Sequence, residues 1–133
     1  MIDIEDEIFD RVAKKLRSVE KDVRIYGEDM GAPSAFPCVT LIEADNATDK
    51  NTQDSSCNEN HVNLMYEVNV YSNLLSDKKK QCKTLLEVID NEFISLGFAR
   101  TTKLYLPVQD STVCRLTARY SAKVSREKII FRR

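Results

Sequence analysis

The sequence predicts a single α+β domain in which two helices cover one face of a mainly antiparallel β-sheet. Two segments repeat apolar residues at helical spacing, and two others alternate strictly between apolar and polar residues. One-sided alternation is typical of antiparallel strands that are covered on one face, which favours both helices on that apolar face. The chain of 133 residues has the length of one domain, predicted at residues 1–125, with a basic tail at residues 126–133.

The first predicted element is a helix at about residues 3–20. Acidic residues open this segment and basic residues close it, as the helix dipole favours. Its apolar stripe consists of Ile4, Ile8, Val12, Leu16 and Val19. A short strand is predicted at residues 23–26, and the segment 27–37, with its glycines and prolines, is predicted to be a connecting loop.

The middle of the chain predicts a long-looped antiparallel hairpin. One strand is expected at residues 38–44 and a second, with strict alternation, at residues 61–71. The apolar side of the second strand consists of Val62, Leu64, Tyr66, Val68 and Val70. Residues 45–60 are almost wholly polar and are therefore predicted to form an exposed loop between the two strands.

The second predicted helix begins after Ser76, its expected N-cap, and runs to Leu96. Gly97 stands where a left-handed C-cap residue belongs. Residues 99–108 predict a strand, and residues 112–124 predict a last strand with renewed alternation. The expected order is therefore α-β-β-β-α-β-β.

No residue pattern indicates catalysis, a cofactor or a metal, so the chain is not predicted to be an enzyme. Nothing in the sequence marks a catalytic partner for His61, the only histidine, and phosphate-binding glycine motifs are missing. Glu43 and Glu67 on neighbouring strands could form a carboxylate pair, although solvated strand residues are the favoured interpretation.

The tail after residue 125 is expected to project from the domain.

The four cysteines have no metal-site spacing. An even number allows two disulfides, but Cys38, Cys82 and Cys114 fall at apolar positions, where reduced cysteines act as small hydrophobes. Cys57 lies in the polar loop and is expected to be the most exposed thiol. The acidic N-terminus lacks a signal-peptide pattern and no apolar run is long enough to span a bilayer, so a cytoplasmic site of synthesis is expected.

Candidate interface residues lie on the polar sides of the 61–71 and 112–124 strands. They are Asn63, Met65, Glu67, Asn69, Tyr71, Arg115, Arg119 and Lys123. Tyr, Met and Arg are enriched in protein interfaces, which favours a protein partner. The basic residues, joined by Arg100 and Lys103 and set near Tyr105, are also compatible with single-stranded nucleic acid, but the net charge of −1 makes this alternative weak.

Charge is unevenly divided along the chain. Residues 1–75 hold seven Lys/Arg against fifteen Asp/Glu, a balance of −8, and residues 76–133 hold thirteen against six, a balance of +7. Chance distribution over a solvated surface is one interpretation. The other is that opposite poles help like subunits to meet head to tail, because complementary patches orient association.

The order of elements, with a second helix that ends in Leu96-Gly97-Phe98, resembles the phage tail terminator, or tail completion, family of long-tailed bacteriophages. The segments 87–100 and 115–122 look like that family's second helix and last strand, and Pro37 after the loop is also similar. The resemblance spans about residues 3–125, whereas the extension at residues 128–133 departs from it. Related head–tail connector and minor tail proteins share much of this organisation.

The resemblance implies a structural protein of the virion, located at the head–tail junction and made in the cytoplasm of a bacterial host. Members of the family form a hexameric ring that ends polymerisation of the tail tube and meets the head connector or stopper protein. Their subunits are often monomeric before assembly, and they need no cofactor and no membrane. The alternative is another connector or minor tail protein, or a small module that binds nucleic acid or protein.

Overall fold

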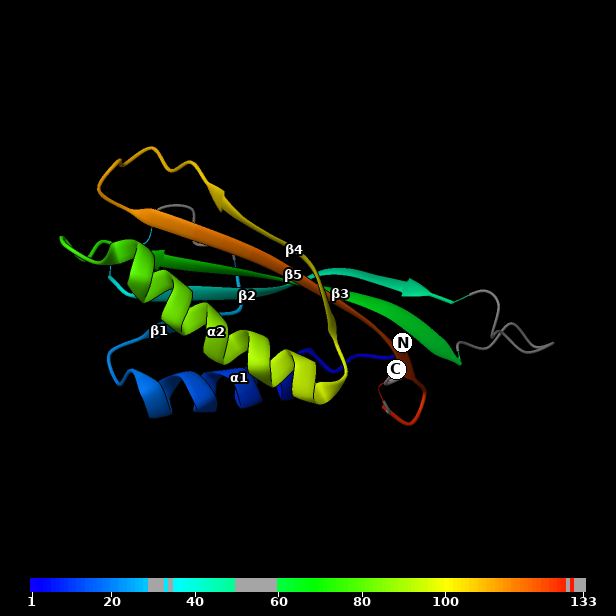
Figure 1. The fold of residues 1–133 in the computed structure, drawn as a ribbon. Helices are drawn as coiled ribbons and strands as arrows, with labels where there is room; N and C mark the ends of the chain where they lie inside the picture. The colour runs from blue at the N-terminus through cyan, green and yellow to red at the C-terminus, as the bar shows by residue number, and fades with distance from the viewer. Residues whose placement is uncertain (29–32, 34, 50–59, 129, 131–133) are drawn as a thin grey trace.

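The structure is a computed structural model that describes residues 1–28, 33, 35–49, 60–128 and 130. Its elements follow the predicted order and form one α+β domain (Figure 1). They are α1 (Glu5–Val19), β1 (Arg24–Tyr26), β2 (Cys38–Thr48), β3 (His61–Ser72), α2 (Lys78–Leu96), β4 (Ala99–Leu106) and β5 (Cys114–Ser125).

The five strands form one sheet in the order β1-β2-β3-β5-β4. Only β1 and β2 run parallel, so the prediction of a mainly antiparallel sheet is confirmed. The predicted hairpin is also confirmed, since β2 pairs antiparallel with β3 from Cys38 opposite Tyr71 to Thr48 opposite Val62. Figure 1 shows both helices beneath the same face of this sheet, where α1 packs beside α2.

The strand β2 is longer than predicted. Residues 45–48 belong to it, because the pairing with β3 resumes after a bulge between Glu43 and Asp45. Backbone hydrogen bonds extend this ladder into a polar segment whose side chains have little to bury, which hydrophobic alternation could not reveal. The remainder of the predicted loop, residues 50–59 with Cys57, lies outside the described residues.

The ends of α2 agree only in part with the sequence. The N-cap residue is Asp77 rather than Ser76, and no side chain caps this end of the helix. Gly97 has a φ of 103°, which confirms the left-handed C-cap. The amide of Phe98, the residue before β4, donates to the carbonyl of Phe93 at 3.0 Å and closes the last turn of the helix.

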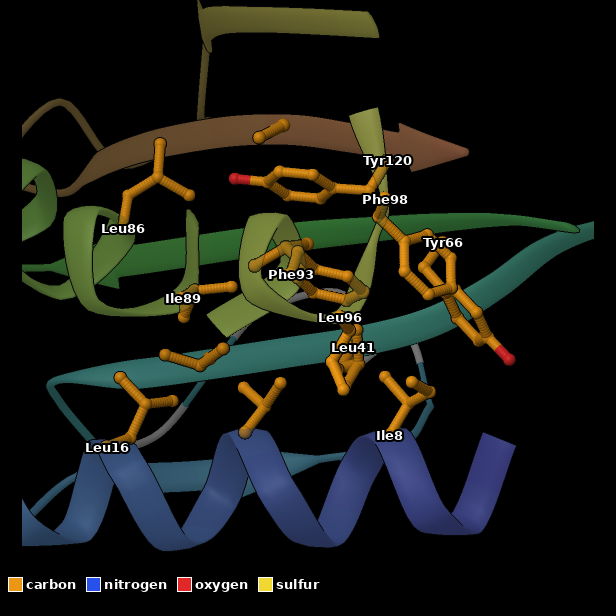
Figure 2. Close-up of a cluster of buried hydrophobic side chains, with 14 of the residues drawn as sticks. Ile8, Leu16, Leu41, Tyr66, Leu86, Ile89, Phe93, Leu96, Phe98 and Tyr120 are labelled. Atoms are coloured by element: carbon orange, nitrogen blue, oxygen red, sulfur yellow. The ribbon is translucent and has the colours of Figure 1, made fainter. Parts of the chain in front are cut away.

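Aromatic residues from α2, β3, β5 and the connection between α2 and β4 fill the centre of the core (Figure 2). Phe93 stacks on Tyr120 with ring centroids 4.4 Å apart and meets the edge of Phe98 at 5.2 Å. Tyr66 lies 5.7 Å from Phe98. Rings at these separations add stabilisation beyond the area that they bury, so this cluster joins α2 firmly to the sheet.

The described cysteines are free thiols, as predicted. Cys38 and Cys82 are fully buried and Cys114 is partly buried. Burial raises the pKa of Cys38 to about 11 and, with Cys114 nearby, that of Cys82 to about 12. Since the thiolate is the reactive form, these two buried thiols act as packing groups.

The prediction that the tail projects is wrong for its described part. The Lys128 ammonium lies 3.1 Å from the Glu7 carboxylate on α1, and Ile130 forms an antiparallel bridge with Val124. The pairing of β4 with β5 starts at Ala99 opposite Ser121, so the β5 backbone beyond Ser121 is open on that side and accepts Ile130. Residues 129 and 131–133 lie outside the described part.

No helix in the described ranges is both long enough and apolar enough to cross a membrane.

Two buried tyrosines should respond oppositely to loss of their hydroxyl groups. The Tyr120 hydroxyl donates to Asp90 at 2.7 Å, whereas no described residue bonds the buried Tyr66 hydroxyl. Burial, with the Glu43 carboxylate nearby, raises the pKa of Tyr66, so that hydroxyl stays protonated. Tyr120→Phe should lower the free energy of unfolding by about 1.5–3 kcal/mol, and Tyr66→Phe should leave it equal or higher. Equal losses in urea titrations of the two variants would contradict this assignment.

Candidate protein interface

We call the side of the sheet opposite the helices the outer face. All eight predicted interface residues lie on it, because β3 and β5 are adjacent and in register. Asn63 lies opposite Lys123, Glu67 opposite Arg119 and Tyr71 opposite Arg115. Met65 and Asn69 occupy the same side of β3 between these pairs.

The eight residues differ sharply in exposure. Asn63 and Arg119 are exposed, while Asn69 and Tyr71 each keep only 2% of their surface in contact with solvent. Burial leaves Asn69 and Tyr71 very little surface for direct contact with a partner of the folded domain. Alternation alone assigned them to a solvated face, because it reports the side of the sheet and not what else packs there.

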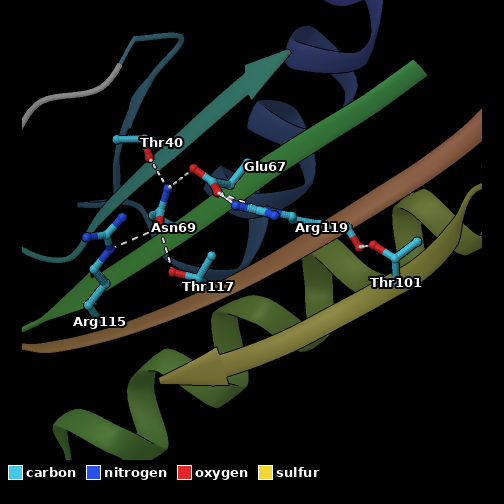
Figure 3. A network of polar contacts seen from close by, with 7 residues as sticks. All are labelled: Thr40, Glu67, Asn69, Thr101, Arg115, Thr117 and Arg119. Atoms are coloured by element: carbon cyan, nitrogen blue, oxygen red, sulfur yellow. Dashed lines mark hydrogen bonds and ion pairs between the residues drawn. The ribbon is translucent and has the colours of Figure 1, made fainter. Parts of the chain in front are cut away.

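Asn69 is the centre of a buried polar network that joins three strands (Figure 3). Its Oδ1 accepts hydrogen bonds from Thr117 Oγ1 at 2.6 Å and from Arg115 Nε at 3.0 Å. Its Nδ2 donates to Thr40 Oγ1 at 3.2 Å and to Glu67 Oε2 at 3.3 Å. Every polar group of this amide therefore has partners, which buried polar groups require.

Ion pairs compensate charge along the rest of the outer face. Arg119 Nη2 lies 3.1 Å from Glu67 Oε1, and Lys123 Nζ lies 2.6 Å from the buried Asp49 carboxylate. A phosphate backbone would have to displace these carboxylates, which is unfavourable for nucleic acid. A protein partner can instead use the polar, partly apolar surface between the pairs.

Arg100 and Lys103 do not join the basic residues of the outer face. A bulge between Arg100 and Thr102 adds one residue to β4, so Arg100 lies opposite Tyr120 and Lys103 opposite Ala118, both on the helix side. Arg100 there pairs with Asp90 of α2 at 2.8 Å. No pattern of residues along this strand indicated the bulge.

Tyr105 also faces the helices, with the Lys79 ammonium 4.9 Å from its ring centroid. Glu43 and Glu67 likewise point to opposite sides, because Glu43 lies opposite Tyr66 and Glu67 opposite Ile42. Tyr105 therefore does not join the basic residues of the outer face, and Glu43 and Glu67 do not form a carboxylate pair.

The two ends of the domain carry opposite charge. Asp3, Glu5 and Glu43 gather where α1 begins, and the amide of Glu43 donates to Glu5 Oε2 at 3.3 Å. Burial and then the neighbouring carboxylates of Asp3 and Glu5 raise the pKa of Glu43. We call this cluster, which also includes Asp6, the acidic end.

The start of α2 forms the basic end, where Lys78, Lys79, Lys80 and Lys83 outnumber the one acidic residue, Asp77, and lie beside the adjoining Leu75. The first turn contains no acidic residue, although a helix N-terminus favours negative charge. Leu75 is 98% exposed, a feature that sequence reasoning missed despite the apolar pair Leu74-Leu75 in a polar setting. Figure 1 shows the starts of α1 and α2 at opposite ends of the helical layer.

In the described part of the chain, no group of three or more His, Cys, Asp or Glu residues could hold a metal ion.

The structure defines a two-layer α+β domain whose helices leave the outer face of a five-stranded sheet uncovered.

This fold resembles that of a chain in a solved structure described as the virion of a native gene transfer agent particle. The TM-score is 0.60 over 86% of this chain and 91% of that chain, at 16% sequence identity. At this identity the likeness concerns the fold. No family model and no curated protein matches the sequence.

Proposed function

We propose that this chain is a structural protein of a phage-like virion. The observation that supports this role best is the fold shared with a chain of a gene transfer agent virion, which extends over 86% of this chain and 91% of the other. The resemblance of the segments 87–100 and 115–122 to tail terminators supports a finer role. In that role the chain caps the tail tube, ends its polymerisation and joins the tail to the head connector, without catalysis and without a cofactor.

The subunits in this proposal form a hexameric ring by head-to-tail contact. Such a contact needs two different, complementary patches on each subunit. The acidic end and the basic end supply these two patches. The acidic end is electrostatically unfavourable alone because carboxylates gather there, and the basic end because lysines gather at a helix N-terminus. Contact between subunits would relieve both.

The exposed part of the outer face is left for the tube protein and the head connector or stopper protein. Asn63, Met65, Glu67, Arg119 and Lys123 are the residues proposed to make these contacts. In this arrangement the protein belongs to the virion, at the head–tail junction, after synthesis in the bacterial cytoplasm, and before assembly it is a monomer.

The assembly is tested by light scattering over a concentration series and by negative-stain microscopy with purified tail tubes. Rings, or caps on tube ends, are expected. A protein that stays monomeric at high concentration and does not bind to tube ends would overturn the proposal.

Charge reversal tests the head-to-tail contact itself. Lys79→Glu, Lys80→Glu and Lys83→Glu together give a subunit with two acidic ends, and Asp3→Lys, Glu5→Lys and Asp6→Lys together give one with two basic ends. Each variant alone should assemble at least about tenfold more weakly than the wild type, because like charges then meet. An equimolar mixture should recover alternating rings.

Lys103→Glu, on the helix side of β4 and outside the residues that define both ends, is the control and should assemble normally. Rings from either reversed variant alone, or no recovery on mixing, would exclude these two ends as the contact.

A further inference from the structure

A groove of about 650 Å³ lies on the outer face, between the segment that precedes β2 and the connection from β4 to β5. Its walls include Phe36, Tyr71, Pro107 and Val113, and its charged residues are Arg115 and Asp110. Sites for small ligands and side chains commonly have this size, with apolar walls and a few placed polar groups. The sequence placed Tyr71 and Arg115 on one face but gave no indication of a groove.

Arg115 is fixed in this groove from two directions. Its Nε donates to Asn69 Oδ1 at 3.0 Å, and its guanidinium carbon lies 5.6 Å from the centroid of the Tyr71 ring. Asn69 is itself held by the buried hydroxyl groups of Thr40 and Thr117 (Figure 3). The guanidinium is therefore positioned before any partner arrives, which reduces the entropy lost on binding.

The Nη groups of Arg115 have no acceptor among the described residues. A guanidinium offers its donors as a planar fork that matches a carboxylate or a phosphate. The apolar walls favour a ligand that also has an apolar side chain, and the Asp110 carboxylate in the same groove disfavours a polyphosphate. The hydrogen bonds from Thr112 lower the pKa of Asp110, so its negative charge persists near neutral pH.

We propose that this groove binds a segment of a partner protein in which an Asp or Glu stands beside an aromatic or aliphatic residue. The carboxylate pairs with the Nη groups of Arg115, and the apolar side chain packs between Phe36 and Pro107. The inference deepens the proposed function, because it gives a partner chemistry to one end of the outer face. It is tested on the isolated monomer, so failure of ring formation and failure of groove binding remain distinguishable.

The test is a ¹H–¹⁵N NMR titration of the protein with three capped tetrapeptides: acetyl-Gly-Phe-Asp-Gly-amide, its Asn analogue and its Ser-for-Phe analogue. The Asp peptide should shift the amides of Val113, Arg115 and Tyr71. The Asn peptide should bind roughly tenfold or more weakly, because it loses a charge-assisted hydrogen bond. The Ser peptide should also bind more weakly, because it loses the apolar contact.

Arg115→Ala should abolish the preference for Asp over Asn, and Arg115→Lys should retain part of it, since a lysine keeps the charge without the fork. Arg17→Ala, an exposed arginine of α1 outside the groove, is the control and should bind like the wild type. Equal binding of the Asp and Asn peptides, shifts away from the groove, or no shifts at millimolar peptide would overturn the inference. So would inorganic phosphate that shifts the same amides as strongly as the Asp peptide, which would indicate a general anion site.

Discussion

Replacement of Phe93 by Ala is expected to lower the free energy of unfolding by about 3–5 kcal/mol, the cost of removing a fully buried aromatic ring. The Phe93 ring is stacked on Tyr120 and meets Phe98, so its removal leaves a cavity between α2 and the sheet (Figure 2). Domains of this size are stable by roughly 5–15 kcal/mol, so the variant should be close to unfolding.

Urea titration followed by circular dichroism measures this loss. If Phe93→Ala is too unstable to fold, Phe93→Leu should show a smaller loss, because it retains part of the ring's volume. Ile94→Ala is the control, because Ile94 is the next residue of the same helix and is 54% exposed. A loss at Ile94 as large as that at Phe93 would mean that the core described for this domain is wrong.

Replacement of Asn69 by Ala is expected to cost about 2–3 kcal/mol. The substitution removes an amide that serves Thr40, Thr117 and Arg115, and Thr40 and Thr117 are buried where water does not reach. Each buried polar group that loses its hydrogen-bond partner lowers the free energy of unfolding by about 1–3 kcal/mol, so the losses at several groups should combine. The NMR signals of Arg115 should broaden, because its Nε loses the acceptor that holds it.

Asn63→Ala is the matched control for Asn69. Asn63 lies on the same strand and the same face but is exposed, so its removal should change the free energy of unfolding by less than about 0.5 kcal/mol. Equal unfolding midpoints for the two variants in urea would show that the Asn69 network contributes no stability. Broadening in Asn63→Ala as well would show that Arg115 is not positioned by Asn69.

Much of the candidate interface could be predicted from alternation. Because side chains alternate strictly in a strand, the polar side of β3 and the polar side of β5 were bound to share a face once the two strands paired. The burial of Asn69 and Tyr71 was not predictable in this way. It depends on the β2 neighbour Thr40 and on contacts across the outer face, which no local pattern reports.

The sequence by itself determined the class of the fold, the order of its elements and the left-handed end of α2 at Gly97. These features depend on local periodicity and on the conformational freedom of glycine, which act within a few residues of each other. Local chemistry also assigned Cys38 and Cys82 to the interior.

Only the tertiary structure decided which residues meet across long stretches of chain. The bulge in β4 puts Lys103 on the helix side together with Arg100, and the open edge of β5 pairs with Ile130. The groove around Arg115 combines the segment before β2, a side chain of β3 and the connection between β4 and β5. Strand register and non-local packing set these relations, because the free energy that selects them comes from contacts between residues far apart in sequence.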